Sequence, residues 1–401
     1  MLMVEMLSTG DEVLHGQIVD TNAAWLADRF FQQGIPLSSR STVGDSLESL
    51  VQKLLERSLC ADILIVNGGL GPTSDDLSAL AAATAAGEPL VEHPEWIAYM
   101  EQYFASRGRE MSVTNRKQAM IPASAELVDN PVGTACGFSI VINDCLMFFT
   151  PGVPSEFKVM INDQILPRLR QRYTLPESPL CLRLTSFGRT ESSLAQQFDV
   201  LTLPEGCVMG YRSSMPIIEL KLTGPASQRE PMLKSWQIIR QGVGDNMLYE
   251  GTEGLASIIS KTLNERGLTL ALSERFSAGL LSWNLLSAKA PVREAMVSAD
   301  NSPQALKQLM AEARALAGTQ GTSLGIAIGD YNQSCLSLAI ATAQGCYAQR
   351  VRYMPRHHDA KIQQDVSVML ALDMLSRWLN NRELFGNYEW LEVVERVGPA
   401  D

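Results

Sequence analysis

The sequence predicts an α/β fold in which a doubly wound, mostly parallel sheet forms the N-terminal domain. Three observations lead to this prediction. Residues 61–66 form a continuous apolar run, which is typical of a strand buried on both faces of a parallel sheet. Residues 21–33 and 45–59 have the apolar spacing of helices. Glycine-containing loops follow the predicted strands, as expected where ligands bind at the carboxyl ends of parallel strands.

The same patterns divide the chain into three predicted domains. Residues 1–172 hold strands near 3–7, 36–43, 61–66 and 146–149, and a polar turn is expected at 8–12. Two prolines near 176–179 indicate a linker. Residues 178–250 are predicted to form a small α+β module. Residues 252–401 are predicted to be α/β again, with strands near 268–272 and 323–328 and a closing amphipathic helix near 359–380.

Composition and charge exclude several classes of protein. The 401 residues carry a formal net charge of −11, whereas a nucleic-acid-binding domain needs a positive surface. An odd count of seven cysteines without a Cys-x-x-Cys pair indicates reduced thiols. The chain lacks an apolar run of about 18 residues that could span a membrane. We therefore expect a cytoplasmic protein with neither a nucleic-acid nor a membrane partner.

Three loops that follow predicted strands carry the candidate chemistry: residues 8–12, 67–76 and 151–156. Glycines let the backbone approach a ligand closely, and exposed N–H groups favour anions such as phosphate. Asp75 and Asp76 have two interpretations, as caps of the next helix or as oxygen ligands of a divalent cation. Glu156 likewise either marks a plain turn, with proline at the start of a helix, or belongs to the site.

Four segments then make the sequence recognisable. They are STGDEVLHGQIVDTN, NGGLGPTSDD, NRKQAMIPASAELVDNPVGTACGF and PGVPSEF, in that order. Together they resemble the CinA (competence/damage-inducible protein A) family, and the first domain is similar to the Mog and Moe molybdopterin-binding fold. The resemblance implies a metal-dependent ADP-ribose pyrophosphatase that releases AMP and ribose 5-phosphate. It also implies a KH-like fold for the middle module and a homodimer.

The resemblance assigns roles residue by residue. Asp75, Asp76 and Glu156 are the expected catalytic residues, and Asp76 with Asp75 would hold Mg²⁺, Mn²⁺ or Co²⁺. Two positions depart from the family pattern, Asp11 in the first turn and Cys136 in the place of a proline. The expected substrate- and phosphate-binding residues are Gly10, Asp11, Glu12, Asn22, Gly68, Gly69, Gly71, Thr73, Asn115, Lys117, Pro151, Gly152 and Ser155. We expect the amides of residues 68–73 and 152–155 to hold the phosphates.

The C-terminal domain is predicted to have lost an activity. It resembles a nicotinamide mononucleotide deamidase, but Arg275 stands where that family has its nucleophilic serine. Arginine stays protonated in proteins and cannot attack an amide. Ala299 replaces a tyrosine, and the glycine-rich loop is replaced from Ile328 onward. Ser277 reads more readily as a small packing residue than as a substitute nucleophile, because covalent catalysis also needs a base within reach.

Two other functions remain open from the sequence. The first is a non-catalytic protein that binds a nucleotide or molybdopterin, because related folds use similar loops for binding alone. The second is nicotinamide mononucleotide deamidation, which Arg275 opposes. Adjacent His357 and His358 indicate a solvated loop rather than a metal site, since two isolated histidines do not complete a tetrahedral set. For each of these functions, the expected partner is a small-molecule nucleotide ligand.

Overall fold

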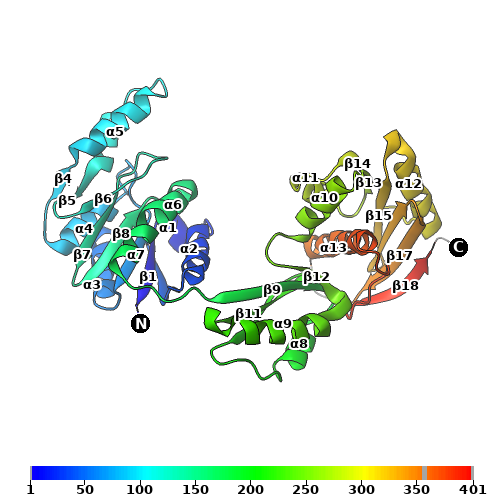
Figure 1. Ribbon diagram of the computed structural model, residues 1–401. Coiled ribbons are helices and arrows are strands. Elements are labelled where there is room, and N and C mark those ends of the chain that lie inside the picture. Colours follow the sequence, from blue (N-terminus) through cyan, green and yellow to red (C-terminus); the bar gives the residue numbers. More distant parts are fainter. Residues whose placement is uncertain (1, 355–358, 399–401) are drawn as a thin grey trace. The chain divides into compact units, whose positions relative to one another are not determined.

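The computed structural model describes residues 2–354 and 359–398 of the chain (Figure 1). His357 and His358 lie outside the described residues. The chain divides into two compact units, residues 1–179 and 180–401, which we describe separately. The predicted division of the second unit into domains 178–250 and 252–401 stays a prediction. Within the described residues, no helix is both long and apolar enough to cross a membrane.

The first unit is built on a six-stranded sheet, which confirms the predicted doubly wound, mostly parallel fold. Its strand order is β2-β1-β3-β8-β7-β6. The pairs β2–β1, β1–β3 and β3–β8 are parallel, whereas β7 and β6 are antiparallel additions at one edge. The strands are β1 (Val4–Thr9), β2 (Ser39–Val43), β3 (Ile63–Asn67), β6 (Glu126–Val128), β7 (Gly137–Ile142) and β8 (Cys145–Thr150).

Strand β3 shows why helices cover both faces of this sheet. Ile63 and Ile65 pack into the core formed with α2 and α6, whereas Leu64 and Val66 pack into the core formed with α3 and α4. Alternate side chains of a strand point to opposite faces, so an uninterrupted apolar run is buried on both. The helices of this unit are α1 (Asp11–Leu14), α2 (Thr21–Gln32), α3 (Leu47–Ser58), α4 (Ser78–Ala86), α5 (Pro94–Ala105), α6 (Pro154–Met160) and α7 (Leu166–Arg172). The small pair β4 (Leu90–Glu92) and β5 (Met120–Pro122), the 3₁₀ turn η1 (Val113–Ala119) and the π-helical turn η2 (Ile161–Ile165) complete it.

One local prediction in the first unit is wrong, and one of two open interpretations does not hold. Ser8 and Thr9 belong to β1, because they continue its parallel pairing with β2, and the turn begins at Gly10. Asp75 and Asp76 do not cap the helix that follows them. That helix, α4, starts at Ser78 after the N-cap residue Leu77, which makes no side-chain capping bond. The two carboxylates are therefore not used by the helix.

The second unit opens with an antiparallel four-stranded sheet of order β10-β11-β9-β12. Leu184, Leu220 and Leu222 on its inner face pack against two helices, as the alternation at residues 217–222 predicted. The elements are β9 (Leu180–Phe187), α8 (Glu191–Phe198), β10 (Val208–Ser214), β11 (Ile217–Gly224), η3 (Ala226–Gln228), α9 (Arg229–Val243), η4 (Gly244–Asn246) and β12 (Met247–Glu250).

The rest of the second unit is a mixed six-stranded sheet, order β14-β13-β15-β16-β17-β18, between two helical layers. Helix α12 covers one face, and α13 with α10 and α11 forms the core on the other. Contrary to the prediction of an amphipathic closing helix, α13 is buried around most of its circumference from Val366 to Leu379. The elements are α10 (Leu255–Glu265), β13 (Leu270–Glu274), α11 (Leu280–Ser287), β14 (Val292–Val297), α12 (Leu306–Gly318), η5 (Thr319–Gly321), β15 (Leu324–Asn332), β16 (Cys335–Thr342), β17 (Gly345–Tyr353), α13 (Ala360–Leu379) and β18 (Leu391–Val397).

All seven cysteines fall among the described residues, and all seven are free thiols, in agreement with the sequence-based prediction.

Candidate functional site

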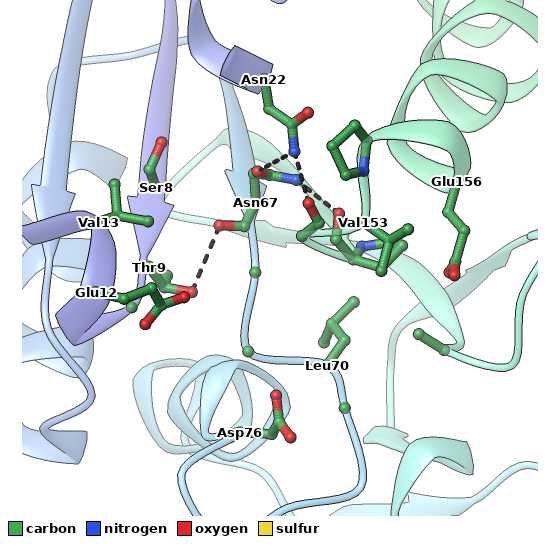
Figure 2. Close-up of a pocket in the computed structure, with 18 of the residues that line it drawn as sticks. Ser8, Thr9, Glu12, Val13, Asn22, Asn67, Leu70, Asp76, Val153 and Glu156 are labelled. Carbon is green, nitrogen blue, oxygen red and sulfur yellow. Dashed lines mark hydrogen bonds between the residues drawn. The ribbon is translucent and has the colours of Figure 1, made fainter. Parts of the chain in front are cut away.

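A cavity of about 520 Å³ lies at the carboxyl edge of the first unit's sheet. Residues directly after β1, β3 and β8 line it, so the three glycine-containing loops of the sequence do come together. Figure 2 shows Glu12, Asp76 and Glu156 around the loop that carries Leu70, each from a different segment of the chain. This is the position at which ligands bind in open α/β sheets.

Two buried asparagines hold the loops together. Asn67, the last residue of β3, donates from Nδ2 to the carbonyl oxygen of Pro151 at 2.7 Å. Asn22, in the first turn of α2, donates to Asn67 Oδ1 at 3.0 Å and to the carbonyl oxygen of Gly152 at 2.8 Å (Figure 2). Buried amide groups need such partners, and here the partners belong to three separate segments. The tie fixes the distance between the 67–76 loop and the 151–156 loop.

The glycine loop after β3 needs its glycines. Gly68 and Gly69 have φ values of 110° and 67°, which side-chain-bearing residues rarely adopt. A Cβ atom at Gly69 would collide with the hydroxyl of Ser78, which donates to the carbonyl oxygen of Gly68 at 2.8 Å. The first turn of α4 is therefore packed directly beneath the loop.

Fewer backbone N–H groups of this loop are free to bind an anion than we expected. The Gly68 N–H donates to the Thr150 carbonyl oxygen at 2.9 Å, and the Thr73 N–H donates to Asp76 Oδ2 at 2.9 Å. Neither N–H group is available for a phosphate, so the expected anion site can use only the amides between residues 68 and 73. Among the described contacts, the N–H groups of Gly69, Leu70 and Gly71 have no hydrogen-bond partner.

Three carboxylates of the cavity each lie against a glycine. Ideal Cβ atoms at Gly10 and Gly71 would come within 2.8 Å of Glu12 Oε1 and 2.5 Å of Asp76 Oδ2. A Cβ at Gly133 would overlap the carboxylate of Glu156. These glycines therefore leave the space that the carboxylates occupy.

The cavity is strongly acidic. Within the part of the chain that the structure describes, neither lysine nor arginine lines it. Burial, followed by the negative charges of Asp11 and Glu12, raises the pKa of Asp45. By contrast, a hydrogen bond from Thr73 lowers the pKa of the exposed Asp75 carboxyl. An anion entering this cavity would need a cation to accompany it. The acidic residues that line it are Glu12, Asp20, Asp45, Asp75, Asp76 and Glu156.

The donor set suits a hard divalent cation that a substrate helps to hold. Among the described residues, no three His, Cys, Asp or Glu side chains are grouped closely enough to hold a metal by themselves. Mg²⁺, however, is usually held by one or two carboxylates, water and substrate phosphates rather than by a cage of protein ligands. Asp76 and Asp75 provide the carboxylate oxygens beside the free amides of the glycine loop.

The structure brings most of the predicted binding residues into the cavity, but not all. Lys117 lies in a small adjoining pocket, where its ammonium group donates to the Thr73 carbonyl oxygen. Asp11 is not among the residues that line the cavity; it exchanges backbone-to-carboxylate bonds of 3.0 and 3.2 Å with Asp45. Thr73, Asn115 and Ser155 are not among the residues that line the cavity. The predicted residues that line it are Gly10, Glu12, Asn22, Gly68, Gly69, Gly71, Asp75, Asp76, Pro151, Gly152 and Glu156.

Sequence reasoning missed several residues of this site. Asn67 directly precedes the first glycine of the second motif, and its position at the end of the predicted strand could have indicated that it belongs to the site. Asp20 lines the cavity and accepts from Ser8 Oγ at 2.5 Å. Asp45 comes from the segment after β2, which carries no motif, and only the fold reveals it.

Arg275, at the position where the resemblance places the deamidase nucleophile, forms an ion cluster. The Arg275 guanidinium contacts Asp300 Oδ2 at 3.1 Å and Glu312 Oε2 at 3.8 Å. Ser277 is buried and donates to Glu274 Oε2 at 2.6 Å. The amides of Leu281 and Ser282 also donate to the Glu274 carboxylate, at 2.9 and 2.7 Å. Ser277 thus bonds a fully buried structural carboxylate. Ile328 lies in the core and Ala299 is exposed.

Comparison with known proteins identifies the family. A CinA-like protein of Escherichia coli is 57% identical over 399 residues, which cover 99% of this chain and 98% of the relative. The chain belongs to the CinA family. Another Escherichia coli member, covered to 99% in both chains at 57% identity, is named NMN amidohydrolase-like protein YfaY.

The first unit also matches a domain family and a solved structure. The model of the family described as "Probable molybdopterin binding domain" matches residues 5–171. The crystal structure of the protein CinA, of unknown function, from Thermoplasma acidophilum is 26% identical and covers 42% of this chain and 96% of its own, with a TM-score of 0.38. The 57% identity to the CinA-like protein over nearly the whole chain confirms the family predicted from the four sequence motifs.

Proposed function

We propose that the first unit hydrolyses a nucleoside diphosphate sugar such as ADP-ribose in the presence of a divalent cation. The observation that carries the proposal is the pairing of free loop amides at Gly69–Gly71 with an acidic cavity that no lysine or arginine of the described chain lines. The amides suit phosphate oxygens, whereas the carboxylates would repel a bare pyrophosphate. A metal complex of the substrate satisfies both groups.

The residues of the cavity then have separate tasks. The amides of Gly69–Gly71 orient the pyrophosphate. Asp76, with Asp75, would hold the divalent ion, which polarises a phosphoryl group and lowers the pKa of bound water. Glu156 lies on the opposite side of Leu70 from Asp76 (Figure 2). There it can accept a proton from the attacking water. Attack of water on one phosphorus breaks the P–O–P bridge and releases AMP and ribose 5-phosphate.

The proposal is tested with purified full-length protein, ADP-ribose and a panel of Mg²⁺, Mn²⁺ and Co²⁺. Wild-type protein should release AMP only when a metal is present. Asp76→Asn should reduce kcat by about 100-fold, because it removes a charged metal ligand and keeps the shape of the side chain.

Asp144→Asn is the matched control. It makes the same chemical change at the β7–β8 turn, where φ is 66° and asparagine is well tolerated. An unchanged rate in Asp76→Asn would contradict the assignment. Thermal stabilisation by the nucleotide without any hydrolysis would instead favour a binding protein.

A further inference from the structure

A buried asparagine outside the cavity contacts one of its carboxylates. Asn130 is fully buried, and its Nδ2 group donates to Glu156 Oε2 at 2.8 Å and to the Ala135 carbonyl oxygen at 3.1 Å. Both partners are acceptors, so the nitrogen of the Asn130 amide must face them. Asn130 itself is not among the residues that line the cavity. Its contact with a ligand would therefore pass through Glu156.

The loop that carries Asn130 is fastened from behind by helix α5. Three aromatic side chains on one face of α5 donate to three carbonyl oxygens of this loop. Trp96 Nε1 donates to Thr134 at 3.0 Å, Tyr99 Oη to Asn130 at 3.1 Å, and Tyr103 Oη to Val132 at 3.3 Å. Their spacing of three and four residues places them on the same helix face. The backbone around Asn130 is thus held at three points.

The same loop confines Glu156 from a second direction. Gly133 lies so close that a Cβ atom there would overlap the Glu156 carboxylate. Glu156 itself is in the first turn of α6, after Pro154, as the interpretation of this loop as a helix start predicted. The carboxylate therefore has a hydrogen-bond donor, a backbone wall and a helix terminus around it.

We propose that Asn130 is a positioning residue, which holds the Glu156 carboxylate in the orientation that the hydrolytic reaction requires. The inference rests on the function proposed above for this cavity and adds a residue to it. Held by Asn130, one Glu156 oxygen is fixed and the other is free to face the cavity. Without the donor, the side chain can rotate, and the chemical step slows more than substrate binding weakens.

The kinetic test uses Asn130→Asp in the full-length protein. Aspartate has nearly the same size but replaces the neutral donor with a carboxyl group, whose ionised form cannot donate and repels the Glu156 carboxylate. We expect kcat for ADP-ribose to fall by about 10- to 100-fold, the usual range for losing a supporting hydrogen bond, with KM changed by less than about twofold. Asn143→Asp, at the β7–β8 turn, is the matched control and should behave as wild type.

A double-mutant cycle separates positioning from a general structural effect. In a Glu156→Gln background, Asn130→Asp should cause no further loss of kcat, because the carboxylate that Asn130 orients has already been removed. A loss of the same size in both backgrounds would overturn the inference, as would full kcat in Asn130→Asp. If Asn130→Asp fails to fold, Tyr99→Phe replaces it. That variant removes only the hydroxyl that bonds the Asn130 carbonyl, and should lower kcat by about two- to fivefold without changing KM.

A second readout does not depend on activity. In protein labelled with ¹⁵N-asparagine, the Asn130 side-chain amide signal should be protected from exchange, and Glu156→Ala should shift it and reduce the protection. An unaffected signal would overturn the contact itself. A wild-type protein that hydrolyses no ADP-ribose would contradict the proposed function, whereas normal hydrolysis that is insensitive to Asn130→Asp would contradict only this inference.

Discussion

Single residues of the cavity show how closely glycine and carboxylate are fitted to each other. Gly71 lies beside the Asp76 carboxylate, which also accepts from the Thr73 N–H. The side chain of Asp76 is therefore held between a backbone donor and the bare Cα of a glycine. Its orientation depends on the absence of a side chain at position 71 as much as on its own hydrogen bonds.

Gly71→Ala should displace this carboxylate. The added methyl group would stand 2.5 Å from Asp76 Oδ2, closer than van der Waals contact allows. We expect kcat for ADP-ribose to fall by about tenfold while the melting temperature changes little, since the loop is at the surface. Steady-state kinetics and a thermal melt check this. Gly318→Ala is the control, because a Cβ there meets no atom within 4 Å. Unchanged kcat in Gly71→Ala would show that Asp76 does not need its present position.

Prediction from sequence at the residue scale succeeded where a motif follows a strand. Gly68, Gly69, Gly71, Asp75 and Asp76 line the cavity, since the carboxyl end of a parallel strand must open at the sheet edge. Hydrogen bonding was not predictable from spacing, and it removed the amides of residues 68 and 73 from the expected anion site. The catalytic and binding roles of these residues stay predictions.

At the scale of elements, the regular strands and helices of the first unit were predictable because their apolar patterns are simple. The strand at 61–66 and the helix at 21–33 agree with β3 and α2 within two residues. Helix α13 was misjudged because its polar residues are satisfied inside the protein. Arg377 is almost fully buried, and it pairs with Asp373 at 2.8 Å and with Asp245 at 2.5 Å. The spacing of apolar residues along the sequence does not reveal such buried ion pairs.

Ion pairs also connect the segments around the four-stranded sheet to the rest of the second unit. Asp245, in η4, accepts from Arg377 on α13 and from Arg382 beyond it. Glu389 accepts from Arg189 at 2.6 Å and from the Thr190 N–H at 2.9 Å. Although burial acts to raise the pKa of both carboxyl groups, these donors outweigh it, and each pKa is lowered.

This arrangement predicts acid sensitivity of the second unit. A carboxyl group whose pKa is lower in the folded than in the unfolded state stabilises the fold above the unfolded value, and that stability is lost as the pH falls through the folded value. The loss should therefore begin as the pH falls below about 4. Urea midpoints of the full-length protein between pH 7 and pH 3 measure it, and Asp245→Asn should flatten the dependence. Equal slopes in the variant and the wild type would contradict the prediction.

At the scale of the whole molecule, the two units differ in what their sequences retain. The first unit has glycine loops, amides and carboxylates gathered at one sheet edge. In the second unit, the position of the expected nucleophile holds Arg275 in contact with Asp300 and Glu312. The Escherichia coli relative YfaY is named an NMN amidohydrolase-like protein, and that description applies to the relative alone.

We predict that the full-length protein does not deamidate nicotinamide mononucleotide. Arg275→Ser should not restore the activity, because Ser277 is committed to Glu274 and Ala299 provides no hydroxyl. Ammonia release from nicotinamide mononucleotide, measured beside ADP-ribose hydrolysis in the same preparation, checks both statements. Turnover by the wild-type protein would refute the loss, and turnover by Arg275→Ser alone would show that only the nucleophile is missing.

The three glycines that face carboxylates also set a rule for how this molecule can change over evolutionary time. Each pair shares one small volume: Gly10 with Glu12, Gly71 with Asp76, and Gly133 with Glu156. In homologues that have lost one of the acidic residues, the paired glycine can be replaced by a residue with a side chain. In homologues that keep the acidic residue, the glycine must be kept as well. Substitutions at the two members of a pair should therefore be correlated across homologous sequences.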